Sequence, residues 1–243
     1  MPHPQSVDRA LALLDELADA DGPLSAKSLA SRLGCSLSTV YELLGSLSAR
    51  GYVARGPRGY GPGPRVSALH TAFRRHVGAD TAVPALLERV RRATGAPAYF
   101  TVYRDGLITT VDTTAPLADP ASPWQIGPET RAHATAHGKV LLAGLSRPER
   151  RRYLTAHGMA RLTTRTITDQ DRFEAEVARV RTRGLAVSVA EADPAYTCLA
   201  VPVPGHPRHA LSVSLSVADY RCRGPRVGSL LADAAARFPA LPE

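Results

Sequence analysis

The sequence predicts an α+β protein with a small helical domain at the N-terminus and a larger C-terminal domain built on an antiparallel sheet. Three observations support this prediction. The first quarter of the chain repeats apolar residues at three- and four-residue spacing between short polar turns. The remainder alternates short apolar runs with amphipathic helical segments. The length of 243 residues exceeds the usual size of one domain, which favours two.

Three helices are expected in the first 50 residues. The first covers residues 6–20 and has one apolar face. Ser25 and Gly34 are the expected N-cap and left-handed stop of the second helix, because a serine hydroxyl accepts from a free N–H and glycine tolerates positive φ. Ser36 caps the third helix, whose apolar face holds Val40, Leu43, Leu44 and Leu47. Two helices joined by a short turn containing glycine are typical of a helix–turn–helix.

A small β-hairpin, or wing, is expected next. Residues 52–54 and 60–61 flank the Gly/Pro turn of residues 56–59. Residues 64–77 then return to helical spacing. We interpret this segment as a helix that connects two domains, or alternatively as a dimer contact made through its apolar edge.

From residue 81 the pattern predicts a mixture of helices and strands. Segments 98–103 and 107–111 flank Asp105-Gly106, a dipeptide typical of a tight hairpin turn. Further strands are expected at residues 185–189, 198–203 and 210–217. Helices are expected at residues 81–94, 133–145, 147–157, 169–183 and 226–238. Helices that flank an antiparallel sheet make an α+β domain.

Composition and charge limit the class of protein. No apolar run approaches the ~18 residues that a membrane span requires, and the first ten residues lack an apolar stretch, so we expect neither a membrane partner nor an export signal. Three widely spaced cysteines indicate a reducing cytoplasm. The net charge is +8. Between Lys27 and Arg75 there are eight basic residues and one acidic residue, which favours a phosphate-facing surface there.

Six motifs in order give the chain a resemblance to a known family. They are Ser6–Leu11, Ser38–Leu44, Arg50–Val53, Gly127–Lys139 with its HATAHGK stretch, Arg165–Asp169, and the pair of late segments Cys198–Val203 and Leu211–Ser214. On these residues, the sequence resembles the IclR family of bacterial transcription regulators over nearly its whole length.

The resemblance implies an N-terminal winged helix–turn–helix, a linker helix and a C-terminal GAF-like effector-binding domain with an antiparallel sheet. We place them at residues 1–63, 64–79 and 80–243. It further implies homodimers, or tetramers as dimers of dimers, on palindromic double-stranded DNA operators. A small-molecule effector would alter the affinity for the operator, which requires differential binding to two arrangements of the protein. Repression is the expected outcome.

The resemblance also implies which residues contact DNA, although this chain departs from the family. Leu37, Glu42 and Gly45 stand where the family usually has basic residues, and without those phosphate contacts binding should be weaker. Leu37 is suited to a thymine methyl group and Glu42 to a cytosine amine. A degenerated DNA-binding face is the alternative. The candidate DNA-binding residues are Ser36, Leu37, Ser38, Thr39, Tyr41, Glu42, Arg55 and Arg58.

The resemblance also implies which residues bind the effector, according to their positions in the sequence. The family binds its ligand near the Gly-Lys signature, on a cysteine and on paired serines of a late strand. Ser188 replaces a usual acid with a neutral hydroxyl, so we expect an effector other than a small keto acid, larger and more aromatic. The candidate effector-binding residues are Trp124, Ala136, His137, Ser188, Cys198, Ser212 and Ser214.

Two other functions compete with this interpretation. An enzyme would use Cys198 as nucleophile with His133 or His137 as base, but the cysteine lies in an apolar strand, where a structural role is commoner. We therefore expect no catalytic residue, no cofactor and no metal, since His133 and His137 have no evident third ligand. We expect Arg147, Arg150, Arg151 and Arg152 to form a solvated helix face. The third class is an effector-domain protein that no longer reads DNA and acts through a protein partner.

Overall fold

The computed structural model describes residues 4–76, 82–115 and 127–238 and confirms the α+β class. The chain divides into two compact units, residues 1–76 and 77–243, which are described separately below. Trp124 lies outside the described residues. Within the described ranges, no helix is both long and apolar enough to cross a membrane.

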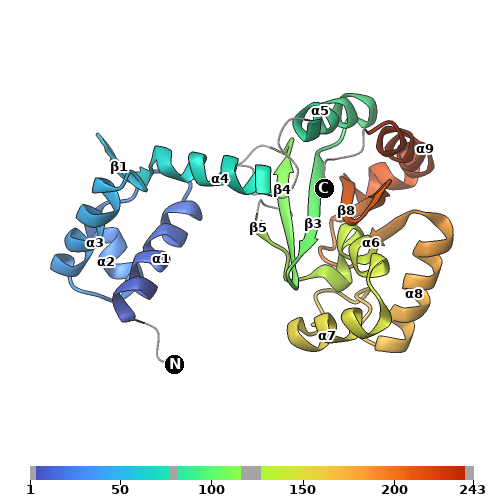
Figure 1. The fold of residues 1–243 in the computed structure, drawn as a ribbon, viewed down its shortest axis with the longest axis horizontal. Helices are drawn as coiled ribbons and strands as arrows, with labels where there is room; N and C mark the ends of the chain where they lie inside the picture. The colour runs from blue at the N-terminus through green and yellow to red at the C-terminus, as the bar shows by residue number, and fades with distance from the viewer. Residues whose placement is uncertain (1–3, 77–81, 116–126, 239–243) are drawn as a thin grey trace. The chain divides into compact units, whose positions relative to one another are not determined.

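The N-terminal unit is a three-helix core followed by a hairpin and a further helix (Figure 1). Its elements are α1 (Gln5–Ala18), α2 (Ala26–Leu33), α3 (Leu37–Ala49), β1 (Val53–Gly56), β2 (Gly59–Pro62) and α4 (Pro64–His76). The buried side chains that hold the three helices together are Leu13, Leu17, Ala26, Leu29, Val40, Leu44 and Val53. This core explains the apolar spacing of the sequence.

The turn between α2 and α3 follows from three residues. The Ser25 hydroxyl accepts from the Ser28 N–H and begins α2, and Gly34 ends it in the left-handed region at φ 60°. The Ser36 hydroxyl accepts from the Thr39 N–H and begins α3. An L-residue at position 34 would be strained, because its Cβ crowds the following carbonyl there. The helix–turn–helix is thereby fixed locally.

The wing contains a pairing that the sequence pattern did not indicate. β1 and β2 form the antiparallel hairpin with Arg55 opposite Tyr60. Leu24, in the loop before α2, adds a bridge by exchanging both backbone hydrogen bonds with Tyr60, at 2.9 and 2.8 Å. The hairpin is therefore anchored to the helical core rather than to its own turn alone.

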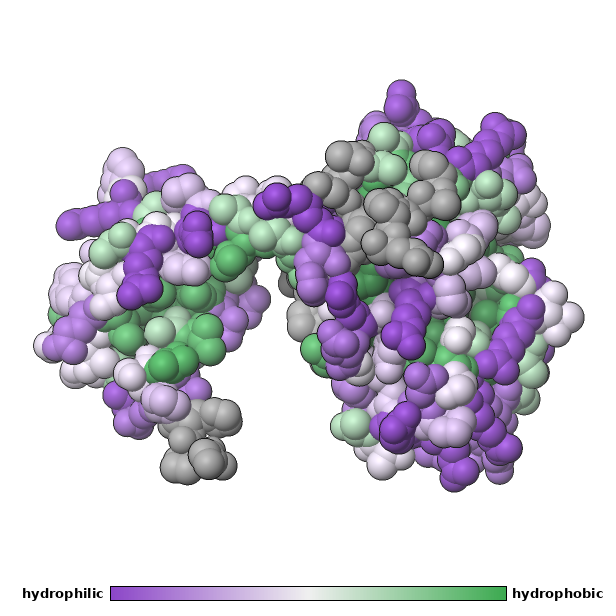
Figure 2. Space-filling view, in the orientation of Figure 1, coloured by the Kyte–Doolittle hydropathy of each residue, from purple (hydrophilic) through white to green (hydrophobic). Residues whose placement is uncertain are grey.

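Apolar side chains also remain on the surface of this unit. Figure 2 shows apolar surface over α1 on the viewed face, and Val7 and Leu11 of that helix are 50% and 55% exposed. Helix α4 has no buried residue, and its Val66 and Leu69 are 38% and 47% exposed.

The C-terminal unit is built on one six-stranded antiparallel sheet of order β5-β4-β3-β8-β7-β6. Its strands are β3 (Ala98–Arg104), β4 (Leu107–Thr113), β5 (Gly127–Pro128), β6 (Ala186–Val189), β7 (Tyr196–Val203) and β8 (His206–Ser216). Its helices are α5 (Ala82–Thr94), the 3₁₀ turn η1 (Ala132–Ala134), α6 (Ala136–Gly144), α7 (Arg147–His157), α8 (Gln170–Arg183) and α9 (Val217–Ala236). Helices α5 and α9 cover one face, whereas α6 and α8 cover the other (Figure 1).

Two of the expected helices differ most clearly in their bounds. The segment 133–145 is not one helix, because Thr135 is extended (φ −109°, ψ 146°) and its hydroxyl caps α6 by accepting from the Gly138 N–H. The closing helix begins at Val217 rather than at residue 226, with Ser216 as its N-cap and Pro225 inside it. A proline removes one helical hydrogen bond without necessarily ending a helix. The Asp105-Gly106 turn is confirmed, since both residues have positive φ, 50° and 82°.

The expectation of a fully solvated arginine face on α7 is wrong for Arg150. This side chain is 1% exposed. Its guanidinium donates to Glu174 at 3.0 and 2.6 Å and to the carbonyls of Leu142 and Leu145 at 3.2 and 2.9 Å. Those carbonyls lie in the last turn of α6, where Leu142 otherwise accepts only a long backbone bond of 3.3 Å from the Leu145 N–H. Arg150 therefore caps a buried helix from outside.

Arg150→Ala should lower the free energy of unfolding by about 3 kcal/mol, because buried carbonyls and a carboxylate lose their donor. Arg151→Ala, at an exposed position on the same helix, should change it by no more than about 0.5 kcal/mol. Urea denaturation followed by circular dichroism measures both. Equal effects of the two substitutions would contradict the capping role.

Candidate functional site

The candidate DNA-binding residues of α3 lie on its solvent-exposed face. Leu37 and Tyr41 are 44% and 54% exposed, and Ser38 and Glu42 are exposed beside them. Ser36 and Thr39 are engaged with each other, with their hydroxyl oxygens 2.9 Å apart. The opposite face of α3 packs through Val40 and Leu44 into the core. The helix therefore presents a continuous outer surface that contains one carboxylate and no basic side chain.

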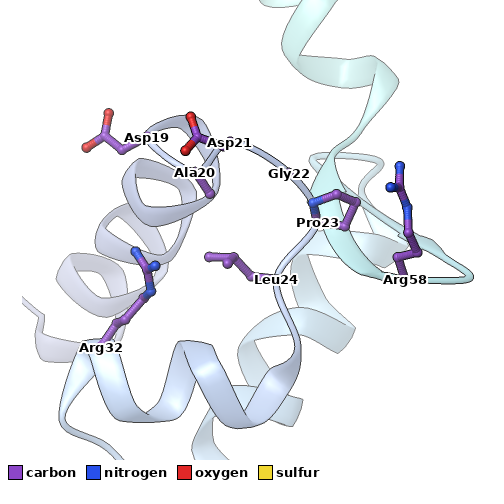
Figure 3. Close-up of a pocket in the computed structure, with 8 residues that line it drawn as sticks. All are labelled: Asp19, Ala20, Asp21, Gly22, Pro23, Leu24, Arg32 and Arg58. Atoms are coloured by element: carbon purple, nitrogen blue, oxygen red, sulfur yellow. The ribbon is translucent and has the colours of Figure 1, made fainter. Parts of the chain in front are cut away.

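Basic groups lie instead on the wing. Arg55 is exposed on β1, with its guanidinium 5.8 Å from the centre of the Tyr60 ring. Arg58 is exposed in the turn and borders a cavity of about 450 Å³, together with Asp19, Asp21 and Arg32. Figure 3 shows Arg58 on the far side of Pro23 from the two aspartates. Both wing arginines thus keep their charge available to an outside partner.

The candidate effector-binding residues that the structure describes come together on the face of the sheet beneath α6. In register across three strands, Ser188 of β6 pairs with Cys198 of β7, which pairs with Ser214 of β8. Two residues further along, Ser212 stands opposite Ala200. Successive residues of a strand point to opposite faces, so these side chains share one face. Residues 188, 198, 212 and 214 are all buried, as are Ala136 and His137 at the start of α6.

The hydroxyls on this polar face differ in their hydrogen bonds. Ser188 donates to the Ala134 carbonyl at 2.5 Å, which ties β6 to η1. Ser212 is 0% and Ser214 4% exposed, yet among the described residues neither hydroxyl has a hydrogen-bond partner. Buried polar groups are nearly always paired, so a pair of unmatched hydroxyls on one strand points to a partner that the protein itself does not supply.

His137 connects this face to a buried acid that the sequence did not indicate. Its Nδ1 lies 4.0 Å from Cys198 Sγ, and its Nε2 lies 3.0 Å from Glu129 Oε2. Burial alone would lower the pKa of His137, but the contacts with Cys198 and Glu129 raise it to about 9. Burial likewise opposes ionisation of Glu129, whereas the imidazolium of His137 holds the pKa of this carboxyl below its ordinary value. The pair is therefore a buried imidazolium and carboxylate at neutral pH.

Three further residues near this face have structural partners. His133 does not reach Cys198 as a base, because its Nε2 contacts the Ala160 carbonyl at 2.9 Å. Lys139, 0% exposed, donates to Glu191 at 2.5 Å and to Glu176 at 3.5 Å. Glu191 lies just beyond the end of β6, and no sequence pattern indicated its role. Among the described residues, no group of three or more His, Cys, Asp or Glu side chains is arranged to hold a metal ion.

Comparisons with known proteins cover nearly the whole chain. Residues 6–57 match the IclR helix-turn-helix domain, and residues 75–238 match the domain described as bacterial transcriptional regulator IclR C-terminal. The HTH-type transcriptional regulator Rv1719 of Mycobacterium tuberculosis (strain ATCC 25618 / H37Rv) is 30% identical over 233 residues, which cover 94% of this chain and 89% of the relative.

Solved structures share the fold at lower identity. The IclR structure of Thermotoga maritima has a TM-score of 0.77 at 21% identity and covers 97% of this chain and 98% of its own. An IclR homologue from Microbacterium hydrocarbonoxydans, complexed with 4-hydroxybenzoate, has a TM-score of 0.75 at 20% identity with 96% of each chain covered.

Replacing the serines of the polar face by alanine should change the free energy of unfolding in opposite directions. Ser212→Ala and Ser214→Ala should leave the free energy of unfolding unchanged or raise it by up to about 1 kcal/mol, because each removes an unmatched buried hydroxyl. Ser188→Ala should lower it by about 1 kcal/mol, since its hydroxyl is hydrogen-bonded. Urea titrations without ligand decide this. Destabilisation by all three would show that Ser212 and Ser214 have partners.

The His137–Glu129 pair predicts a pH dependence with a definite sign. The folded pKa of His137, about 9, exceeds its ordinary value of 6.5, so its contribution is fully present below about pH 6.5 and is lost as pH rises through 9. The wild type should thus lose stability, on the order of 3 kcal/mol, over this range relative to His137→Gln. Unfolding free energies at pH 6 and pH 9.5 measure the difference. Parallel profiles for the two proteins would contradict the assigned charge.

Proposed function

The chain belongs to the IclR family of bacterial transcriptional regulators, and on that premise we propose a repressor whose operator affinity changes when a small metabolite binds the polar face beneath α6. The family assignment makes it a ligand-responsive DNA-binding regulator. The unmatched hydroxyls of Ser212 and Ser214, buried beside the His137 imidazolium, are the observation that carries the proposal for the effector.

The DNA contact would be made by the outer face of α3 and by the wing. A helix of this size fits the major groove, where Leu37 and Tyr41 supply apolar contacts and Glu42 accepts from a cytosine amine. Phosphate contacts would come chiefly from Arg55 and Arg58, because α3 itself has no basic residue. This division gives base readout to the helix and most of the electrostatic affinity to the wing.

The effector would be an organic acid that is larger and more aromatic than a small keto acid. Ser212 and Ser214 each offer a hydroxyl that can donate or accept, and the protonated His137 favours an anionic group nearby. The homologue from Microbacterium hydrocarbonoxydans carries 4-hydroxybenzoate, which belongs to this chemical class. Trp124 stays a prediction for one wall of the site.

A homodimer, or a tetramer made of two dimers, fits the exposed apolar side chains of α1 and α4. Val7, Leu11 and Leu69 are each about half exposed, which is costly for an isolated helical unit. Pairing of two heads would cover them and present two recognition helices to a palindromic duplex, in the cytoplasm where the DNA lies.

A second candidate function is supported by the same α3 surface. A recognition helix with an exposed acid and no basic side chain is also expected of a head that has lost DNA binding. Such a protein would keep the effector-binding unit and act through a protein partner.

Binding to a duplex selected from a random library distinguishes the two candidates. Arg55→Ala/Arg58→Ala should weaken binding and reduce the slope of log K against log salt by about one for each phosphate that is no longer neutralised. A matched variant, Arg172→Ala/Arg183→Ala, removes two exposed arginines from α8 and should leave the slope unchanged. Failure to select any duplex at low salt would favour the protein-partner function.

A further inference from the structure

A cavity in the C-terminal unit lies outside the polar face described above. It has a volume of about 290 Å³ and opens between the tip of the β3–β4 hairpin and α7. The side chains that matter for its chemistry are Tyr103, Glu149, Arg152, Tyr153, Ala156 and His157. Its volume is at the lower end of ligand-binding pockets, which suits a molecule with a single ring.

The walls of this hairpin–α7 cavity are aromatic. The Tyr103 and Tyr153 rings have centroids 6.2 Å apart and are tilted by 60°. His157 stacks on Tyr153 at 4.0 Å, one helical turn further along α7. Tyr153 is 5% exposed and its hydroxyl donates to the Glu129 carbonyl at 3.2 Å, so this ring is held in place. A fixed aromatic wall costs little ordering entropy when a flat ligand packs against it.

Two arginines lie at or near the cavity, Arg152 in its lining and Arg208 beside its Tyr103 wall. Arg152 lines the cavity from an exposed position, and the Arg208 guanidinium lies 5.7 Å from the centre of the Tyr103 ring. Glu149, the carboxylate among the described lining residues, already accepts from the Ser146 backbone and hydroxyl at 3.0 and 2.6 Å and lies 3.8 Å from Arg208. An anionic ligand would thus meet one more positive than negative charge.

We propose that the hairpin–α7 cavity is a second small-molecule site, which binds a planar aromatic carboxylate with its ring against Tyr103 and Tyr153 and its carboxylate toward Arg152 and Arg208. The site is separate from the serines of the polar face. A ligand in this cavity would contact Tyr153, whose hydroxyl donates to the Glu129 carbonyl. The carboxylate of Glu129 in turn pairs with His137.

Isothermal titration of the full chain with benzoate tests the chemistry of this site. Cyclohexanecarboxylate keeps the charge without the aromatic ring, and benzamide keeps the ring without the charge. Both should bind at least about tenfold more weakly than benzoate, because each lacks one of the two contacts. Equal affinity for all three compounds, or no benzoate binding at millimolar concentration, would overturn the proposal.

Paired variants locate the binding event. Arg152→Ala should weaken benzoate binding at the hairpin–α7 cavity about tenfold, and Ala156→Trp should abolish binding at that cavity by filling it. Their exposed neighbours supply the controls, since Arg151→Ala and Thr155→Trp should bind as the wild type does. Unchanged melting temperatures show that the variants remain folded.

The same titration in Ser212→Ala/Ser214→Ala separates this site from the effector site. Benzoate affinity at the hairpin–α7 cavity should persist in that background and still be lost on adding Ala156→Trp. Benzoate binding that survives Ala156→Trp and Arg152→Ala but disappears in the double serine variant would place the ligand on the polar face and refute the second site.

Discussion

The C-terminal unit depends on the burial of nearly all of α6. Residues 136–143 are all buried, including the charged Lys139, so the polar groups of this helix must find partners inside the protein. Lys139 pairs with Glu191 and Glu176. At the other end, Arg150 and Arg181 donate to carbonyls of residues 142, 143 and 145. Gly138 is required by the same packing, because a Cβ there would overlap the backbone of Ala132.

Because Lys139 and the last carbonyls of α6 have partners inside the protein, the unpaired hydroxyls of Ser212 and Ser214 are an exception. Polar groups buried without partners cost free energy, and a ligand that satisfies them recovers it. Ser212 and Ser214 lie on the sheet face that packs beneath α6, whose first turn carries His137 beside Cys198. A metabolite bound there would therefore contact the sheet and the helix that covers it. Differential contacts of this kind are what a ligand needs to shift a protein between two arrangements.

Much of the fold could be predicted from the sequence because it depends on contacts between residues close together in the chain. Contacts between residues far apart in the chain could not be predicted in this way. The helix–turn–helix follows from Ser25, Gly34 and Ser36, whose capping roles depend on neighbours within three or four residues. The resemblance to a family indicated the row of Ser188, Cys198 and Ser214. The partners of Arg150, Lys139 and His137 lie 24, 52 and 8 residues away, and no periodicity of apolar residues reports such pairs. Arg150 was expected in solvent because its neighbours on α7 are charged.

A crystal structure of the chain with an effector found by ligand screening is the decisive measurement for the polar face beneath α6. We expect polar atoms of the effector within hydrogen-bonding distance of both Ser212 Oγ and Ser214 Oγ, with His137 beside its anionic group. An effector that changes DNA affinity while bound elsewhere, with both hydroxyls still unpartnered or bonded to the protein itself, would refute the assignment of these serines to the effector.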